Sequence, residues 1–321
     1  MKAVVYTEYG SPDVMRLAEV EKPAPKDHDV LVKVHAVSVN RSDWEALVGK
    51  PLYARMDGLF RPSVSILGAD IAGRVEAVGS AVREFQVGDE VFGETLRYHD
   101  GFAEYVCVPE KAMLRKPAWM SFAEAAAMPQ AGGIAVQAMR DKGQVKAGHQ
   151  VLINGAGGGA GTYAVQLAKC FGAEVTGVDN TGKLEFLRSL GADHVIDYTR
   201  EDFTRTGKQY DLILDVIAHR SVFAYQRALK PGGRYYLVGG SVASMFQILF
   251  LGRLIRNATG KRIRILVVRP NRDDLKFLIG LREAGKITTV IDREYPLSEV
   301  PDALRYLGEG HAKGKVVITI P

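Results

Sequence analysis

The chain has 321 residues, of which 47% are hydrophobic, 25% charged and 8% aromatic. This length and composition exclude a peptide hormone and a disordered chain, and they predict about two globular domains. Lysine and arginine total 42 against 37 aspartate and glutamate residues, so the net charge of +5 suits phosphate-bearing ligands without requiring nucleic acid. Cys107 and Cys170 are too few for a disulfide framework or a four-cysteine zinc site.

The N-terminal residues are typical of a strand rather than of a secretory leader, so we expect a cytoplasmic location. The most apolar stretch, residues 242–252, is shorter than the roughly 20 residues that cross a bilayer. Basic residues follow it, so a helix lying on a membrane surface is a minor alternative to a buried helix or a subunit contact. No nucleic-acid partner is expected, because the basic residues cluster only at 253–264.

Short apolar runs alternate with turn residues in the first third of the chain. Residues 30–37, 73–78 and 102–108 are predicted strands, separated by glycine and proline. Helical periodicity is scarce before Ser121. The pattern therefore predicts an antiparallel, barrel-like first domain.

The pattern changes at Ser121, where Ser121 and Glu124 are predicted to form a capping box that opens an alanine-rich helix. A domain boundary near residue 122 follows. Beyond it, alternating strands and helices predict βαβ units and a parallel sheet. The strands are predicted at 150–154, 174–178, 194–196, 211–214, 234–238 and 263–268, and the helices at 160–171, 182–190, 220–229 and 273–284. A last strand at 315–320 follows short segments of the barrel type, and the final fifty or so residues could belong to either domain.

A glycine-rich segment joins one predicted strand to the helix after it. Gly158 would let the main chain approach a pyrophosphate, and Gly161 would let the helix pack closely on the strand. Amides at the helix N-terminus would hold the negative charge. Because no Gly-Lys-Ser/Thr follows, the segment is not a nucleoside triphosphate loop. The predicted cofactor-binding residues here are Ala156, which stands where the dinucleotide fingerprint prefers a glycine, Gly157, Gly158, Gly159, Ala160 and Gly161.

Asp179 ends the next predicted strand, about 20 residues after Gly158, where dinucleotide-binding proteins carry an acidic residue. Its carboxylate would accept hydrogen bonds from the adenosine ribose of NAD and would oppose the 2′-phosphate of NADP. Lys183 and Tyr198, with Arg188, lie where a 2′-phosphate could instead find cations and a hydroxyl. The sequence leaves the choice between NADH and NADPH open.

The order of elements and a series of short motifs resemble the medium-chain dehydrogenase/reductase superfamily over essentially the whole chain, and most closely its zinc-free quinone oxidoreductase branch. These motifs are residues 38–43, 67–73, 88–91, 101–105, 190–193, 197–198 and 314–317. The resemblance implies an α/β protein with a GroES-like β-barrel substrate domain, a Rossmann doubly wound parallel-sheet domain and a cleft between them. The substrate domain would comprise residues 1–122 and 268–321, and the Rossmann domain residues 123–267. A homodimer is expected through the exposed edge strand at 263–268.

The resemblance also implies site residues. Asn40 and Asp43 match positions that face the nicotinamide, where Asn40 would bond a carboxamide or ribose group; the alternative is a turn between two strands. Tyr53 or Tyr98 would donate to the substrate carbonyl, unless each is a tyrosine at the edge of the core. Backbone groups at the end of the fifth strand would receive the nicotinamide amide, at Val238, Gly239, Gly240 and Ser241. Ile217 ends the fourth strand in a similar way, and its alternative is a plain core residue.

No metal is expected. Zinc-dependent relatives carry a cysteine near Asn40 and a Gly-His-Glu where this chain has Gly68-Ala69-Asp70, so the expected thiolate and imidazole are missing. Hydride transfer to an electrophilic quinone or enone needs no Lewis acid. The resemblance therefore implies a zinc-independent oxidoreductase that uses NADPH or NADH to reduce quinones or conjugated enones and enals. Two alternatives stay open. One is a zinc-free alcohol or carbonyl reductase. The other is a low-turnover NAD(P)H-binding or sensing protein, because Ile134 replaces the usual threonine that contacts the cofactor.

Overall fold

The computed structural model describes residues 1–55, 58–95 and 99–321. The chain divides into two compact units. Unit 1 comprises residues 1–130, 270–275 and 289–321, and unit 2 comprises residues 131–269 and 276–288. The expectation that residues 1–122 with 268–321 and residues 123–267 form separate domains stays a prediction.

Unit 1 is built on a largely antiparallel sheet in the order β14-β15-β3-β4-β5-β7, in which only the β14–β15 pair of the described strands is parallel. Strand β3 (Asp29–Val39) lies at its centre, and its alternating valines are buried in the core. β6 (Tyr105–Pro109) also pairs with β3. The other strands are β4 (Asp70–Val78), β5 (Glu90–Glu94), β7 (Met113–Arg115), β14 (Ile291–Pro296) and β15 (Lys315–Thr319), and β1 (Lys2–Val5) pairs with β2 (Arg16–Glu19) in a separate sheet.

The expectation of little helix before residue 121 is wrong at one place. Helix α1 (Arg41–Val48) follows β3 directly, with Asn40 at its N-cap. The Asp43 carboxylate reaches back to accept the Asn40 amide at 2.7 Å, which satisfies a donor that would otherwise lack a partner at the helix start. Asn40 and Asp43 therefore lie at the beginning of a helix and not in a turn between two strands.

The predicted capping box is confirmed. The Ser121 hydroxyl accepts the amide of Glu124, and the Glu124 carboxylate accepts the amide of Ser121, each at 3.1 Å. The alanine-rich helix is shorter than predicted, because α2 (Phe122–Ala126) ends before Pro129, where α3 (Pro129–Val136) begins. The remaining helical segments of unit 1 are α9 (Val300–Gly308) and the 3₁₀ turns η1 (Pro12–Val14), η2 (Leu52–Arg55), η3 (Glu110–Ala112) and η6 (Leu297–Glu299).

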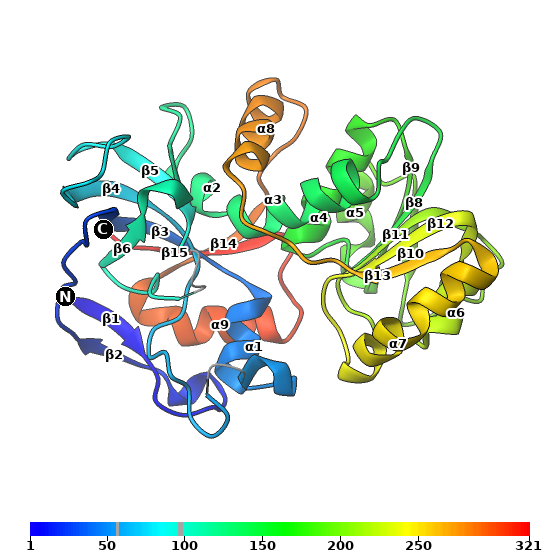
Figure 1. The fold of residues 1–321 in the computed structure, drawn as a ribbon, viewed down its shortest axis with the longest axis horizontal. Helices are drawn as coiled ribbons and strands as arrows, with labels where there is room; N and C mark the ends of the chain where they lie inside the picture. Colours follow the sequence, from blue (N-terminus) through cyan, green and yellow to red (C-terminus); the bar gives the residue numbers. More distant parts are fainter. Residues whose placement is uncertain (56–57, 96–98) are drawn as a thin grey trace. The chain divides into compact units, whose positions relative to one another are not determined.

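Unit 2 contains a six-stranded parallel sheet in the order β10-β9-β8-β11-β12-β13, which confirms the predicted doubly wound fold. Helices α4 and α5 cover one face, and α6 and α7 cover the other (Figure 1). The chain order reverses between β8 and β11, and open sheets of this kind bind ligands at the strand ends beside such a reversal. The strands are β8 (Gln150–Asn154), β9 (Glu174–Asp179), β10 (His194–Asp197), β11 (Tyr210–Asp215), β12 (Leu229–Leu237) and β13 (Arg262–Ile265).

The helices of unit 2 follow the predicted order, and residues of α8 fall in both units. They are the π-helix η4 (Gln137–Lys142), α4 (Gly159–Cys170), the 3₁₀ turn η5 (Thr181–Lys183), α5 (Leu184–Ser189), α6 (Val222–Arg227), α7 (Val242–Thr259) and α8 (Arg272–Glu283). Helix α7 contains the apolar stretch at residues 242–252 and continues to Thr259. Among the residues that the structure describes, no helix has the length and apolarity that a membrane span requires.

Candidate functional site

The glycine-rich segment of unit 2 forms a tight turn from β8 into α4. Gly155 has φ of 80°, a left-handed conformation that favours glycine, and the amides of Gly155 and Ala156 donate to the Val178 carbonyl at 3.0 and 3.1 Å. Gly158 is the N-cap of α4. The amides of residues 159–161 have no acceptor within the helix, so this N-terminus can bind a negatively charged group.

Two glycines of this turn meet different surroundings. A Cβ atom on Gly161 would lie 2.3 Å from the Gly155 carbonyl oxygen and 2.5 Å from that of Ala156, so the helix packs too closely on the turn for any side chain. A Cβ atom on Gly158 would meet nothing nearer than the Gly155 oxygen at 3.5 Å. The open side of Gly158 therefore leaves space in which a ligand can approach the main chain.

Asp179 ends β9 and is 6% exposed. Its Oδ2 accepts the Gly157 amide at 2.8 Å, and its Oδ1 accepts the Asn180 amide at 2.9 Å. The Lys183 Nζ lies 3.7 Å from Oδ1 and partly balances the negative charge. Asp179 thus connects the glycine turn with the segment that follows β9.

Tyr198 lies beside this group, because its amide donates to the Asp179 carbonyl at 3.1 Å, and its side chain is 53% exposed. The structure therefore brings Asp179, Lys183 and Tyr198 together at one end of the sheet. Arg188 does not join them in the described structure, since its guanidinium pairs with Glu185 on α5.

The other predicted cofactor residues lie at the carboxyl ends of β11 and β12. The Ile217 side chain is 50% exposed, and the Gly240 backbone bridges to Ala218. Ser241 is the N-cap of α7, with its hydroxyl accepting the Ser244 amide at 3.1 Å. Val238 and Gly239 lie in the same half-exposed segment between β12 and α7.

Sequence reasoning missed Asp215, which is buried at the end of β11. It accepts hydrogen bonds from the Asn154 amide group and the Tyr235 hydroxyl, both at 2.8 Å, and from the Ile217 amide at 3.1 Å. Burial raises the pKa of Asp215, while these donors oppose that rise. The network connects the ends of β8 and β11 where the strand order reverses. The sequence did hold a signal for this network, because the two apolar strands β8 and β11 each end in a polar residue, Asn154 and Asp215.

In unit 1, the Asn40 carboxamide is buried and bonded at both ends. Its Oδ1 accepts from the Lys315 Nζ at 2.5 Å, and its Nδ2 donates to Oδ2 of Asp70 at 3.0 Å. An ammonium can only donate and a carboxylate accepts, so these partners fix which end of the amide is which. Among the described residues only Asp70 accepts from this amide group, so one N–H is left for a further partner.

Asp43 is almost fully buried, and its carboxylate accepts the amides of Asn40 at 2.7 Å and of Gly68 at 3.0 Å. Burial raises the pKa of Asp43 to about 7, against the opposing effect of these two donors. The carboxylate therefore holds the start of α1 against the loop before β4.

Tyr53 lies in η2 and is half-buried. Its hydroxyl donates to Oε2 of Glu45 at 3.0 Å, and Arg41 lies 3.5 Å from the same carboxylate. Burial, followed by the negative charge of Glu45, raises the pKa of Tyr53. Tyr98, the other predicted donor, lies outside the described residues.

Three charged side chains that sequence reasoning did not select are buried together: Asp70 at 0% exposure, Lys315 at 2% and Glu94 at 7%. Asp70 and Glu94 are directly opposite on β4 and β5, and the Lys315 Nζ lies 3.9 Å from Oδ2 of Asp70. Burial lowers the pKa of Lys315; burial and the charge of Asp70 raise the pKa of Glu94 to about 8. In the sequence, Asp70 and Lys315 lie within the family motifs at 67–73 and 314–317, but no sequence pattern marks Glu94 as a functional residue.

These residues do not fit a catalytic zinc site. Within the described ranges, no three histidine, cysteine or carboxylate side chains are grouped so that they could hold a metal ion. Asn40 and Asp70 are both occupied by contacts with the Lys315 ammonium, which already supplies a positive charge between them. A neutral amide and a single carboxylate do not replace the thiolate and imidazole that such a site uses.

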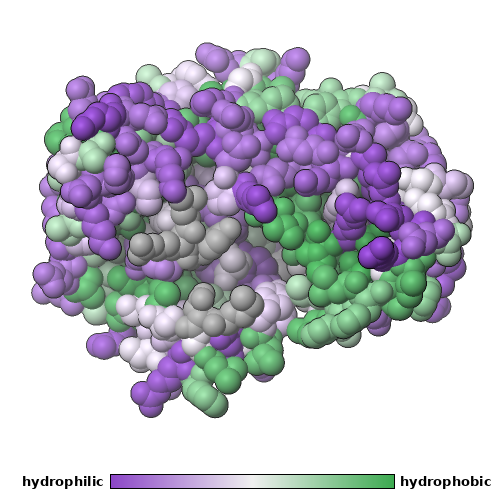
Figure 2. All heavy atoms as spheres, in the orientation of Figure 1, coloured by the Kyte–Doolittle hydropathy of each residue, from purple (hydrophilic) through white to green (hydrophobic). Residues whose placement is uncertain are grey.

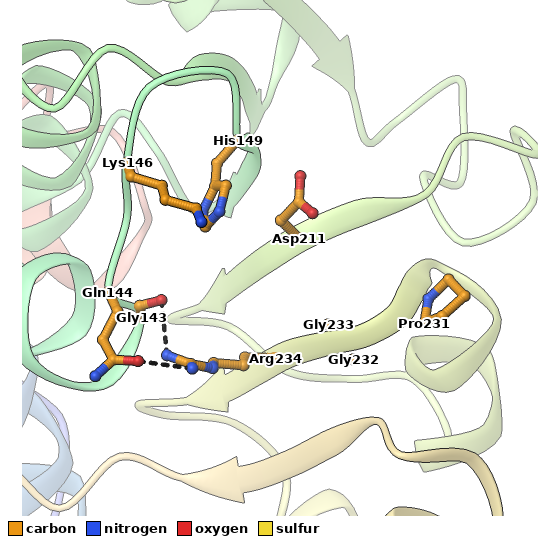
Figure 3. Close-up of a pocket in the computed structure, with 9 residues that line it drawn as sticks. All are labelled: Gly143, Gln144, Lys146, His149, Asp211, Pro231, Gly232, Gly233 and Arg234. Atoms are coloured by element: carbon orange, nitrogen blue, oxygen red, sulfur yellow. Dashed lines mark hydrogen bonds between the residues drawn. The ribbon is translucent and has the colours of Figure 1, made fainter.

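A pocket of about 440 Å³ in unit 2 lies elsewhere. It is lined by residues at the amino ends of β8, β11 and β12, whereas the glycine turn and Asp215 lie at the carboxyl ends. Figure 3 shows Arg234 directed toward Gly143 and Gln144, whose oxygens accept its hydrogen bonds at 3.0 and 2.7 Å. The lining residues are Gly143, Gln144, Lys146, His149, Asp211, Pro231, Gly232, Gly233 and Arg234. This pocket is not part of the candidate site.

Two family descriptions match the chain: an alcohol dehydrogenase GroES-like domain over residues 26–118 and a zinc-binding dehydrogenase over residues 190–318. A 2-methylene-furan-3-one reductase of Solanum lycopersicum is 37% identical over 330 residues, which cover 99% of this chain and 79% of that protein. An NADPH-dependent alkenal/one oxidoreductase, chloroplastic, of Arabidopsis thaliana is 36% identical over 334 residues, with the same shares covered, 99% and 79%. Among solved structures, the quinone oxidoreductase from Coxiella burnetii has a TM-score of 0.89 and 30% identity, covering 100% of this chain and 99% of that one.

Proposed function

Because the chain belongs to the medium-chain dehydrogenase/reductase superfamily, in its quinone oxidoreductase branch, we propose that it is a zinc-independent oxidoreductase that transfers hydride from NADPH or NADH to quinones or to conjugated enones and enals. The observation that carries this proposal is the glycine turn at the reversal of strand order, with an open side at Gly158 and helix amides after it that have no acceptor within the helix. The names of the two plant relatives, an alkenal/one oxidoreductase and a methylene-furanone reductase, favour an acceptor in which C=C is conjugated to C=O.

The cofactor is a nicotinamide dinucleotide, which supplies the hydride when bound. The α4 N-terminus would hold its pyrophosphate, and the segment around Asp179 would bind the adenosine ribose. The half-exposed ends of β11 and β12 would receive the nicotinamide amide. The proposed cofactor-binding residues are Ala156, Gly157, Gly158, Gly159, Ala160, Gly161, Asp179, Lys183, Tyr198, Ile217, Val238, Gly239, Gly240 and Ser241.

Asn40, Asp43 and Tyr53 are the proposed catalytic-site residues of unit 1. The free N–H of the Asn40 amide group could bond a carboxamide or ribose group of the cofactor. Asp43 would act by holding the backbone of Asn40 and Gly68. Tyr53 could offer its hydroxyl to a carbonyl oxygen once it releases Glu45.

A steady-state panel of quinones, enones and aldehydes, each with NADPH and with NADH, tests the proposal. Reduction of quinones, or of the C=C bond of enones as identified by NMR of the product, is the expected result. Reduction of the C=O bond would favour a zinc-free alcohol or carbonyl reductase. Cofactor binding without turnover on any acceptor would favour an NAD(P)H-binding or sensing protein, which the Ile134 substitution motivates.

We further propose a homodimer. Strand β13 is an edge of the unit 2 sheet, and α7 beside it exposes Phe246, Leu249, Phe250 and Leu254 at fractions of 54, 64, 72 and 62%. Figure 2 shows apolar surface in the region where Figure 1 draws α7. Light scattering on the size-exclusion peak should give twice the chain mass, with Phe250→Asp giving the monomer. Val87→Asp, at a 64% exposed site in unit 1, is the matched control.

For location and partners, we propose a cytoplasmic protein with no nucleic-acid partner. Cys107 and Cys170 are free thiols, as is usual in a reducing compartment. Cell fractionation tests the location. Electrophoretic mobility of random DNA and RNA in physiological salt tests the partner, and a shift at micromolar protein would contradict it.

A further inference from the structure

Lys315 is unusual because its ammonium is buried inside unit 1. The residue begins β15 and is 2% exposed, whereas lysine is almost never fully buried unless it is paired. Taking an ammonium out of water is costly, and only close partners can offset that cost. The partners here are Oδ1 of Asn40 at 2.5 Å and Oδ2 of Asp70 at 3.9 Å.

Asp70 in turn connects several elements. Besides the amide group of Asn40, it accepts the Ser38 hydroxyl at 3.1 Å and the Gln130 amide at 3.2 Å. These donors come from β3, the start of α1 and the start of α3. Lys315, Asn40 and Asp70 therefore form one continuous buried contact path, in which each side chain limits the orientation of the next.

The charges around Lys315 come from three elements. Asp43 on α1, Asp70 on β4 and Glu94 on β5 all act on its ammonium, and Lys315 is the one buried cation that faces them in the described structure. Without it, Oδ1 of Asn40 would lose its donor, and the Asn40 amide could turn over. Asp70 would then keep a buried negative charge with no opposite charge nearby.

We propose that Lys315 is a positioning residue of the candidate site: it holds the Asn40 carboxamide in one orientation and supplies the positive charge that keeps Asp70 ionised within unit 1. Its effect on catalysis rests on the proposed function, because only Asn40 would touch the cofactor. Its effect on folding does not.

The test uses the full chain with Lys315→Met, Lys315→Gln and the double variant Lys315→Met/Asp70→Asn. Lys313→Met, which changes an exposed lysine two residues away, is the matched control. Thermal unfolding is followed at pH 6 and pH 8.5. Turnover of a quinone and fluorescence-detected binding of NADPH are measured on the same samples.

We expect Lys315→Met to lower the Tm by on the order of 5–10 °C, because removing one partner leaves buried carboxylates uncompensated. The loss should be larger at pH 8.5 than at pH 6, where the carboxyls can take up protons. The double variant should recover at least about half of the lost Tm, because it removes the unpaired charge as well.

Turnover should behave differently from stability. Both variants with Met at 315 should lose roughly tenfold or more in kcat, since Asn40 is no longer oriented, while KM for NADPH changes less than about threefold. Lys315→Gln keeps a donor for Oδ1 of Asn40, so it should retain more kcat than Lys315→Met although it loses the charge. A merely structural lysine would not give this separation.

The proposal is overturned if Lys315→Met matches Lys313→Met in Tm at both pH values, or if the double variant is no more stable than Lys315→Met. It is also overturned if Lys315→Met and Lys315→Gln lose kcat equally. If Lys315→Met fails to fold, Lys315→Gln and the double variant still decide between these outcomes. A wild type that neither binds a nicotinamide nor reduces any acceptor would refute the proposed function, while the stability series would still test the charge role of Lys315.

Discussion

The Gly157 amide donates a 2.8 Å hydrogen bond to Oδ2 of Asp179. A Cβ atom on Gly157 would lie 2.7 Å from Cδ of Lys183 and 3.0 Å from the same carboxylate oxygen, so a larger residue there would have to displace the Lys183 and Asp179 side chains. Asp179 therefore shapes the glycine turn in addition to placing a negative charge at the end of β9. Changing it should affect both the stability of the fold and the choice of cofactor.

Asp179→Ser should raise the ratio of kcat/KM for NADPH to that for NADH by roughly tenfold, which corresponds to about 1.4 kcal/mol. The variant removes the repulsion of the 2′-phosphate and frees the Lys183 ammonium, which now lies 3.7 Å from the carboxylate. Steady-state kinetics with both cofactors against one quinone gives the ratio. The gain should change little with salt, because Asp179 and Lys183 are both buried and salt screens chiefly exposed charges.

Asp193→Ser is the control, because Asp193 also accepts a backbone amide, that of Val175, and pairs with Lys169 near the opposite end of β9. It should lower the Tm without changing the cofactor ratio. A level or reduced ratio in Asp179→Ser would show that this carboxylate does not face the adenosine ribose.

Gly158→Val and Gly161→Val should separate binding from folding. Gly158 has open space at its Cβ position, so its variant should fold, with normal circular dichroism, and fail to bind the nicotinamide cofactor in a fluorescence titration. The Gly161 side chain would collide with two backbone oxygens, so its variant should lose at least about 1–3 kcal/mol of unfolding free energy. Unchanged cofactor affinity in Gly158→Val would contradict the assignment of the turn.

Features with local causes could be predicted from the sequence. The strand β8, its glycine turn and helix α4 are adjacent in the chain, and their pattern needs no distant partner. Helix α1 was missed although Asn40 and Asp43 have capping-box spacing, because its 8 residues are too few to show periodicity. The buried group of Asp70, Glu94 and Lys315 could not be predicted, because the pairing of β4, β5, β3 and β15 brings these residues together.

Removal of metal should leave the enzyme unchanged. The Lys315 ammonium already contacts both Asn40 and Asp70, so these side chains offer poor ligands for a divalent cation. Dialysis against a chelator should change neither the Tm nor the rate of quinone reduction, and elemental analysis should find no stoichiometric zinc. Bound zinc whose loss abolishes turnover would refute the zinc-independent mechanism.

Glu94 should make the stability of the protein fall as the pH rises through neutrality. It is 7% exposed, and no described residue donates a hydrogen bond to its Oε1. Burial, together with the charge of Asp70, raises its pKa from 4.5 to about 8. Because the folded pKa lies above the unfolded one, its contribution to stability is complete below pH 4.5 and is lost as the pH approaches 8.

Glu94→Gln removes this titration while keeping the size of the side chain. Its unfolding free energy should match that of the wild type near pH 4.5 and exceed it by a few kcal/mol, on the order of 3, at pH 8. Denaturant titrations at several pH values measure the difference.

Glu90→Gln on the same strand is the control of opposite sign, because ion pairs with Lys116 and Arg74 lower the pKa of Glu90. Glu90→Gln should therefore lose stability relative to the wild type as the pH rises from below the lowered pKa of Glu90 to the ordinary value of 4.5, and the difference should stay constant above that value. A Glu94→Gln difference that stays constant with pH, or that follows the sign of Glu90→Gln, would show that Glu94 is ionised in the folded protein at neutral pH.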